Sequence, residues 1–193
     1  MIIIVLFILI WVFIDILSLK AKYHKLPNKR VLTLILAIYI IFVLYVTLLN
    51  RTMGKAIDYN LELFWSYKNM LMVPGMSYFK EIVLNIVLFV PFGFLPIILF
   101  EKLNSIKVIV PLAFMFSLYI ELSQIVLKIG LFEFDDLFDN TLGALIGYGI
   151  FFSLNSIISN SKNQMTRFVL GLIPFFIVSA FFIAIFFVKT SNP

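Results

Sequence analysis

Long apolar runs separated by shorter polar connections dominate the pattern of this sequence. Each run is close to the length of about 20 residues that a helix needs to cross a hydrocarbon core about 30 Å thick. Backbone polar groups in lipid must be satisfied within the segment, so we expect every run to be helical. The runs lie at roughly 2–19, 31–50, 81–100, 108–127, 137–158 and 168–188. The pattern predicts an all-α polytopic transmembrane helical bundle of about six helices, in a single integral membrane domain spanning 1–193.

The connections differ in length and in chemistry. Residues 101–107 and 159–167 are short, which predicts two helical hairpins. The only long connection, 51–80, is too rich in aromatic residues and Met for a flexible linker. We expect it to lie in the outer interface of the membrane as a short amphipathic or re-entrant piece. Within the third run, Pro91 and Pro96 predict kinks.

Composition supports a membrane protein. The chain is 63% hydrophobic and 13% charged, with a mean hydropathy of +1.11, which leaves too little polar surface for a soluble globule. It has no Cys and a single His, His24, so thiolate and His-based catalysis are excluded and any metal would need oxygen ligands. The net charge of +5 is spread over the connections, so we expect no nucleic-acid partner.

The distribution of basic residues predicts the orientation. Nine Lys and Arg residues lie in the connections 20–30, 101–107 and 159–167, whereas the six others are spread over the opposite side. Connections that are dense in Lys and Arg stay in the cytoplasm. We therefore expect a multi-pass protein with both termini extracytoplasmic.

Polar residues inside the apolar runs form helical stripes near the outer side. They are Glu81 and Asn85 in the third run, Ser117, Glu121, Gln124 and Lys128 in the fourth, and Asp136, Asn140, Gly143 and Gly147 in the fifth. Spacings of three and four place each set on one helix face. A carboxylate facing lipid costs at least ~2.5–3.5 kcal/mol, so these faces should meet protein or water. The glycines admit a close neighbouring helix.

We therefore expect three helices to form an outward-facing polar site beneath a lid made by the connections 51–80 and 128–136. Its acidic members would be Glu81, Glu121, Glu133, Asp135 and Asp136, with Asp139 pointing off the stripe and Arg51 as the nearest strong cation. Alternative interpretations remain for individual residues. The Asp residues suit the positive end of a helix dipole, the glycines suit simple packing, and Glu121 suits a structural bond between helices.

Three separated motifs resemble the VanZ-like family of bacterial membrane proteins. They are NIVLFVPFGFLP at 85–96, YIELSQ at 119–124 and DDLFDNTLGALIGY at 135–148, and the resemblance covers about 31–155. By motif position it carries functional polar residues onto Asn85, Glu121, Gln124, Asp135, Asp136, Asn140 and Thr141. Many members have an Arg where this chain has 128–131, and an apolar residue at the position of Asp139. No established catalytic activity comes with the family.

The resemblance implies a protein of the cell envelope, in the plasma membrane, that lowers susceptibility to lipoglycopeptides such as teicoplanin. We expect it to be non-enzymatic and to bind a membrane lipid, a lipid-linked cell-wall intermediate or the lipoglycopeptide itself, without a required cofactor or metal. The alternative is an intramembrane enzyme acting on a lipid-linked envelope substrate, in which the acids hold a divalent cation such as Mg²⁺ or Ca²⁺. A transporter is less favoured, because the inner halves of the runs carry few polar residues and no repeat is evident.

Overall fold

The computed structural model describes residues 28–49, 59–72 and 77–158. Within them, four helical segments are long and apolar enough to cross a membrane. They are Lys29–Leu49, Ser77–Leu99, Ile106–Val126 and Phe134–Asn155. The predicted all-α membrane fold is confirmed, and these segments correspond to the second to fifth predicted runs. The predicted first and sixth runs lie outside the described residues.

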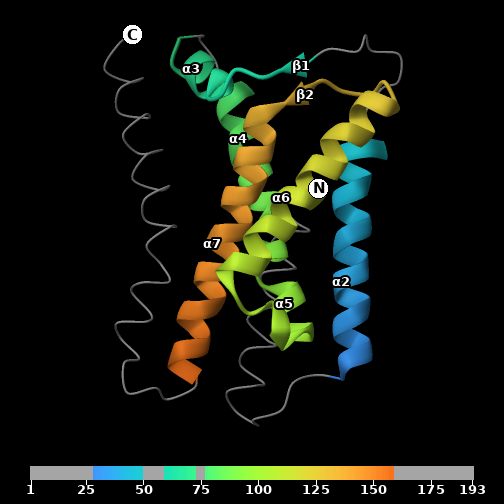
Figure 1. Cartoon of the computed structure of the whole chain (residues 1–193), viewed down its shortest axis with the longest axis vertical. Helices are drawn as coiled ribbons and strands as arrows, with labels where there is room; N and C mark the ends of the chain where they lie inside the picture. Colours follow the sequence, from blue (N-terminus) through green and yellow to red (C-terminus); the bar gives the residue numbers. More distant parts are fainter. Residues whose placement is uncertain (1–27, 50–58, 73–76, 159–193) are drawn as a thin grey trace.

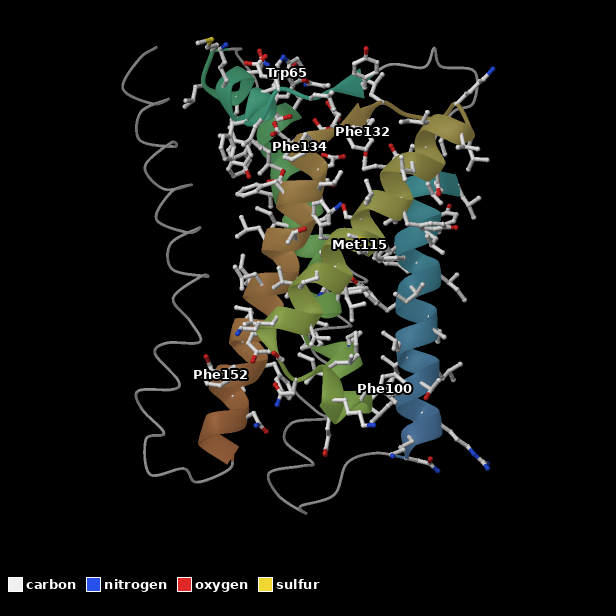
Figure 2. All side chains as sticks on the ribbon, viewed as in Figure 1. Trp65, Phe100, Met115, Phe132, Phe134 and Phe152 are labelled. Carbon is white, nitrogen blue, oxygen red and sulfur yellow. The ribbon has the colours of Figure 1, made fainter. Side chains whose placement is uncertain are left out.

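The first described segment is helix α2 (Lys29–Leu44), which continues into the π-helical turn η1 (Tyr45–Leu49). Asn28 caps its beginning, because its side-chain oxygen accepts a hydrogen bond from the backbone N–H of Arg30 at 3.0 Å. Much of α2 exposes large apolar side chains, among them Leu34 and Ile41. Exposed apolar side chains on a helix of this length suit contact with lipid. In Figure 2, side chains of α2 extend outward on the side away from α6 and α7.

The third predicted run is broken rather than continuous. Helix α4 (Ser77–Phe89) is followed by the 3₁₀ turn η2 (Pro91–Gly93) and the short helix α5 (Leu95–Leu99). Pro91 has no N–H to continue the helical ladder, which explains the break. Pro96 lies in the first turn of α5, where proline is tolerated, so it does not add the second kink that the sequence predicted.

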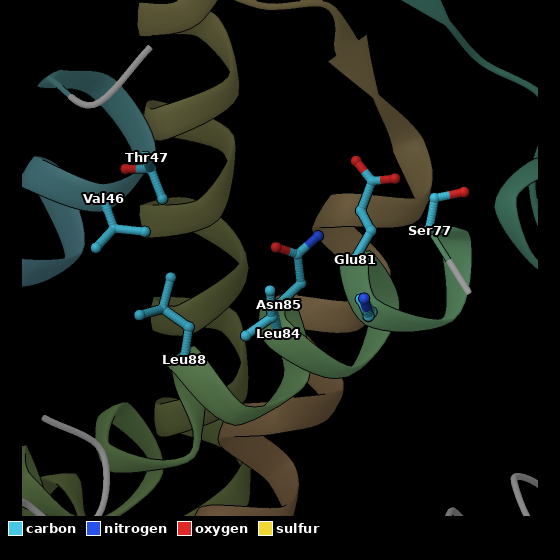
Figure 3. Close-up of a pocket in the computed structure, with 8 residues that line it drawn as sticks. Val46, Thr47, Ser77, Glu81, Leu84, Asn85 and Leu88 are labelled. Atoms are coloured by element: carbon cyan, nitrogen blue, oxygen red, sulfur yellow. The ribbon is translucent and has the colours of Figure 1, made fainter. Parts of the chain in front are cut away.

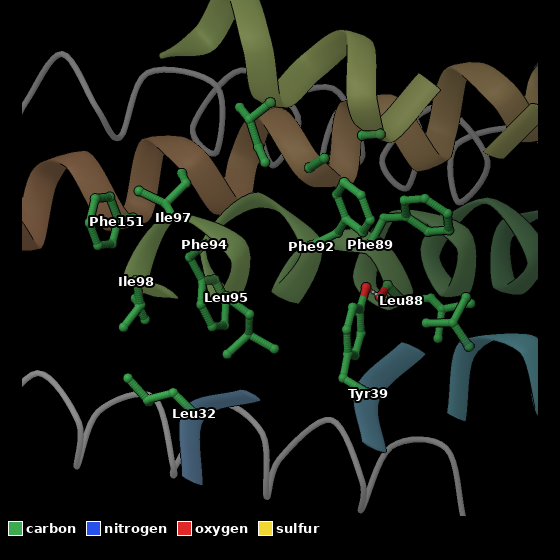
Figure 4. Close-up of a cluster of buried hydrophobic side chains, with 14 of the residues drawn as sticks. Leu32, Tyr39, Leu88, Phe89, Phe92, Phe94, Leu95, Ile97, Ile98 and Phe151 are labelled. Carbon is green, nitrogen blue, oxygen red and sulfur yellow. Dashed lines mark hydrogen bonds between the residues drawn. The ribbon is translucent and has the colours of Figure 1, made fainter. Parts of the chain in front are cut away.

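A buried hydrogen bond satisfies a carbonyl beside this break. The hydroxyl of Tyr39, which is fully buried on α2, donates to the carbonyl oxygen of Leu88 at 2.9 Å. Figure 4 shows this bond among the apolar side chains that fill the inner part of the bundle. The rings of Phe92 and Phe116 stack there with centroids 5.3 Å apart. This cluster joins α2, the broken segment and α6 into one core.

Helix α6 (Ile106–Val126) follows the 3₁₀ turn η3 (Glu101–Leu103) and ends in a Schellman motif. The N–H of Ile129 donates to the Gln124 carbonyl and the N–H of Lys128 to the Ile125 carbonyl, both at 3.0 Å. Lys128 has a left-handed backbone with φ of 53° and an exposed side chain. Its predicted place on the polar stripe of the fourth run is therefore wrong, because the helix ends before it.

Helix α7 (Phe134–Ile158) lies centrally and packs against both α4 and α6, as Figure 1 shows. Two glycines bring its backbone against α4 and the turn that follows it. A Cβ added at Gly143 would lie 2.1 Å from the carbonyl oxygen of Ile86, and one at Gly147 would lie 2.0 Å from that of Val90. Only a residue without a Cβ permits this approach, so the two backbones are in direct contact.

The connections at one end of the bundle also have structure. Strand β1 (Tyr59–Asn60) pairs in parallel with β2 (Phe132–Glu133), with Tyr59 opposite Phe132 and Asn60 opposite Glu133. The short helix α3 (Trp65–Met72) follows β1 and lies over the start of α7 (Figure 1). The sequence predicted a short amphipathic piece here but not the strand pairing, which joins the two connections expected to form the lid.

Candidate functional site

Three carboxylates from three different elements converge at the end of the bundle that carries β1 and β2. Glu81 of α4, Glu133 of β2 and Asp136 of α7 each place an oxygen atom within 4.8 Å of the others. Glu81 is exposed, Glu133 is half-buried and Asp136 is buried. We call these three residues the acidic cluster. About 50 residues of sequence separate Glu81 from the other two members, so the packing of α4 on α7 creates it.

Two further side chains position the acidic cluster. The side-chain N–H of Asn85 donates to a carboxylate oxygen of Asp136 at 2.6 Å. The carboxylate of Glu121, which is 1% exposed, accepts the backbone N–H of Glu133 at 3.1 Å. Glu121 thus orients the strand that carries Glu133, and Asn85 joins α4 to α7. Buried polar groups need such partners, because an unsatisfied one costs about 1–3 kcal/mol.

Two buried amide side chains lie on the helices that surround the cluster, Gln124 on α6 and Asn140 on α7. Asn140 donates through its side-chain nitrogen to the hydroxyl of Ser117 at 2.9 Å. Gln124 donates in the same way to the carbonyl of Thr47, at 3.4 Å. The remaining oxygens, Oδ1 of Asn140 and Oε1 of Gln124, are buried without a hydrogen-bond partner among the described residues. The hydroxyl of Thr141 bonds instead to the Leu137 carbonyl of its own helix, at 2.7 Å.

Helix α7 has a second acidic face, which points toward α3. The two carboxylate oxygens of Asp135 accept the backbone N–H groups of Phe64 at 2.6 Å and Ser66 at 2.7 Å. Four residues later, Asp139 accepts a hydrogen bond from the hydroxyl of Tyr67. Asp135, which the sequence grouped with the outward-facing acids, therefore anchors α3. Asp139, which the sequence left out, is 1% exposed and belongs to the same anchor.

The contact with Asp139 also affects the protonation of the Tyr67 hydroxyl. Burial raises the pKa of its phenol above the usual value, and the negative charge of Asp139 raises it further. The hydroxyl therefore stays protonated and available as a donor. The sequence contains a signal that Asp135 and Asp139 act together, since they are four residues apart and share a face of the helix.

A strained residue lies at the start of the anchored helix. Phe64 has a left-handed backbone with φ of 64°, which is uncommon for a bulky side chain. Its ring makes T-shaped contacts with Tyr67 at 5.6 Å and with Phe138 at 5.3 Å. These ring contacts and the Asp135 carboxylate together hold the unusual conformation.

A cavity of about 320 Å³ opens between η1 and α4 beside the acidic cluster. Figure 3 shows Glu81 and Asn85 on its polar side, and Thr47 facing them from η1. Leu84 and Leu88 line its apolar side. Because Glu81 and Asn85 also belong to the acidic cluster and its support, the cavity and the cluster form one site with a polar end and an apolar wall.

The structure brings most of the predicted site residues together. Glu81, Asn85, Glu121, Gln124, Asp136 and Asn140 lie on the facing sides of α4, α6 and α7. Gly143 and Gly147 lie at the contact between α4 and α7. Arg51 lies outside the described residues. The carboxylates of the acidic cluster are oxygen donors of the kind that Mg²⁺ and Ca²⁺ take, and their spacing fits a shared cation.

Apolar helices around a buried polar site, open at one end of the bundle, define a helical integral membrane protein with a candidate binding site. A family model described as VanZ/LLP1 matches residues 2–159, so the chain belongs to the VanZ/LLP1 family. The match extends on both sides of the region 31–155 that carries the three motifs. Comparisons with curated proteins and with solved structures find no match.

Proposed function

We propose that this VanZ/LLP1 protein binds a membrane lipid or lipid-like amphiphile at the acidic site and thereby lowers susceptibility to lipoglycopeptide antibiotics such as teicoplanin. The observation that carries the binding proposal is the cavity of about 320 Å³ with carboxylate and amide groups at one end and Leu84 and Leu88 along its wall. A polar headgroup with an apolar tail matches such a lining, because each part meets groups of its own polarity.

The proposal places the site at the extracytoplasmic face of the plasma membrane. It is supported by the orientation that the Lys and Arg count predicts, and by Lys102 and Lys107 in the connection 101–107 at the other end of the bundle. Alkaline phosphatase fused after Asn104 should be inactive, because that connection would be cytoplasmic, whereas a fusion after Gly130 should be active. The reverse pattern would place the acidic site in the cytoplasm and reject the proposed route to an extracellular antibiotic.

Antibiotic susceptibility tests the function directly. A strain lacking the gene would be complemented with the wild-type protein, with Glu81→Gln or with Glu101→Gln, at matched membrane levels. Glu101 is an exposed acid in η3, at the opposite end of the bundle, and serves as the control. We expect wild type and Glu101→Gln to lower teicoplanin susceptibility and Glu81→Gln to resemble the empty vector. Equal susceptibility with wild type and with empty vector would remove the resistance function.

A second candidate function rests on the spacing of the acidic cluster. Three carboxylates with oxygens within 4.8 Å of one another suit a divalent cation, which would support an intramembrane enzyme acting on a lipid-linked envelope substrate. Elemental analysis of the purified protein, combined with a phosphate-release assay on undecaprenyl-type lipid phosphates, separates the candidates. A stoichiometric cation together with turnover would favour the enzyme, and the absence of both would leave the binding function.

A further inference from the structure

The charged side chains of the described residues are divided unequally between the two ends of the bundle. The end that carries β1 and β2 has seven acids and three lysines. The opposite end, where α2 begins and α5 ends, has Lys29, Arg30, Lys102 and Lys107 against one acid, Glu101. This opposite end is therefore suited to an anionic partner.

The packing of α2 on α5 brings basic residues from two distant parts of the chain to one place. Leu32 of α2 and Ile98 of α5 are buried in the same apolar cluster, and Figure 4 shows them across from each other. Lys29 precedes Leu32 by three residues and lies on the same face of α2. Lys102 follows Ile98 by four residues, in the turn η3. The two lysines therefore border the same junction between α2 and η3.

The positive charges of this junction are not neutralised by the described part of the chain. Lys29 and Lys102 are exposed, and neither makes a salt bridge within 28–49, 59–72 and 77–158. Glu101 adjoins Lys102 in the sequence, but it is exposed and forms no salt bridge with it. Lys68, by contrast, pairs with Glu62 at 3.5 Å at the other end of the bundle. Both ammonium groups of the junction are therefore available to an anion.

The apolar surface beside the two lysines favours a lipid over a soluble anion. Phe100 is 55% exposed and lies beside the lower part of α2 in Figure 2. Along α2, the exposed side chains of Leu34, Ile38 and Ile41 follow Lys29. Lys29 and Ile41 are about 18 Å apart at the helical rise of about 1.5 Å per residue, close to half of a hydrocarbon core about 30 Å thick. A headgroup at the lysines and an acyl chain along α2 would each meet groups of their own polarity within one leaflet.

We propose that the junction between α2 and η3 binds an anionic phospholipid, whose phosphate lies between Lys29 and Lys102 and whose acyl chains follow Phe100 and the exposed face of α2. This site lies at the end opposite the acidic cluster and does not depend on the proposed function. Each ammonium offers the phosphate oxygens a positive charge and N–H donors. Phosphatidylglycerol carries a net negative charge, whereas the trimethylammonium of phosphatidylcholine cancels the charge of its phosphate. The site therefore selects phosphatidylglycerol over phosphatidylcholine.

Native mass spectrometry of the full-length protein tests this selectivity. Protein in detergent would be mixed with equal amounts of dioleoyl phosphatidylglycerol and dioleoyl phosphatidylcholine, and the retained lipids would be counted. A basic residue near an anionic headgroup favours binding roughly fivefold, so Lys29→Gln and Lys102→Gln should each lower the preference for phosphatidylglycerol by about that factor. The variant with both substitutions should lower it by roughly 25-fold. Lys68→Gln combined with Lys128→Gln removes the same charge at the other end and should keep the preference.

The outcomes that would overturn the site are distinct from those that test the proposed function. Equal retention of the two lipids by wild type would reject an anionic-lipid site. A preference that survives both lysine substitutions would place the anionic lipid elsewhere and overturn the assignment as well. Thermal unfolding in the same detergent checks that each variant is folded. Glu81→Gln, which tests the acidic site, should leave the preference unchanged, so the two proposals can fail separately.

Discussion

Asp135 and its neighbour Asp136 are both acidic and buried, yet they serve different parts of the molecule. Asp135 accepts backbone N–H groups from Phe64 and Ser66, which flank the first residue of α3. Replacement by Asn keeps the shape of the side chain but removes its charge and turns one acceptor into a donor. The Asn variant can accept only one of the two N–H groups, so the start of α3 loses one charge-assisted hydrogen bond.

The cost of Asp135→Asn follows from the exposure of the two N–H groups. Phe64 is 45% exposed and its N–H can turn to water, whereas Ser66 is 4% exposed and keeps the remaining oxygen. The loss is therefore close to one hydrogen bond to a charged acceptor, about 2 kcal/mol. Local opening of α3 should become roughly 30-fold more frequent, at about 1.4 kcal/mol per tenfold change.

Amide hydrogen exchange read out by mass spectrometry measures this opening. Peptides that cover 64–70 should exchange roughly 30-fold faster in Asp135→Asn, and peptides from the middle of α6 should be unchanged. Glu62→Gln is the control, because Glu62 pairs with Lys68 at 3.5 Å while both side chains are more than half exposed. Such a surface pair contributes about 0–1 kcal/mol, so exchange should change little. Wild-type exchange in Asp135→Asn would refute the anchoring role.

Three other substitutions probe the fold, each by thermal unfolding in detergent. Gly143→Ala should destabilise the protein by about 1–3 kcal/mol, although alanine is the better helix former, because the new Cβ meets the Ile86 carbonyl oxygen at 2.1 Å. Unchanged stability would disprove the direct backbone contact. Tyr39→Phe should cost about 1 kcal/mol through the lost bond to the backbone, whereas Tyr45→Phe at an exposed position should cost nothing measurable. Lys128→Gly should stabilise by about 1 kcal/mol, because glycine adopts the left-handed conformation without strain; a loss of stability would contradict this.

The spans were predictable because hydropathy and length determine them almost alone. Helix α6 was predicted at 108–127 and lies at Ile106–Val126. The start of α4 was harder, since Ser77–Lys80 are polar or aromatic and extend the helix beyond the apolar run. The strands β1 and β2 have two residues each, too few for any periodic signal. Only the packing of the connections against each other brings them together.

For the site residues too, the helix face was predictable from the sequence, whereas the partner of that face was not. Helical spacing placed Asp136 and Asn140 on one face, and the structure brings that face to α4 and α6. The same spacing relates Asp135 and Asp139, which were not grouped from the sequence. Their partner is α3, whose position depends on tertiary packing rather than on any pattern within α7. Thr141 bonds to its own helix, as a threonine in an apolar helix commonly does. A sequence pattern identifies which residues share a face, and the fold decides what each face meets.

The glycine contacts of α7 determine how the two halves of the site line up. The carbonyl oxygens of Ile86 and Val90, four residues apart, lie where a Cβ would be at Gly143 and Gly147, which are also four residues apart. Ile86 is on α4, and Val90 directly follows it. Sliding α4 along α7 by one residue, about 1.5 Å, would move those oxygens toward positions that carry a Cβ. The two glycine contacts therefore fix the axial position of α4 relative to α7. While both glycines remain, Asn85 stays opposite Asp136. The other side chains at the acidic end can then change, in evolution or by design, without moving the two helices.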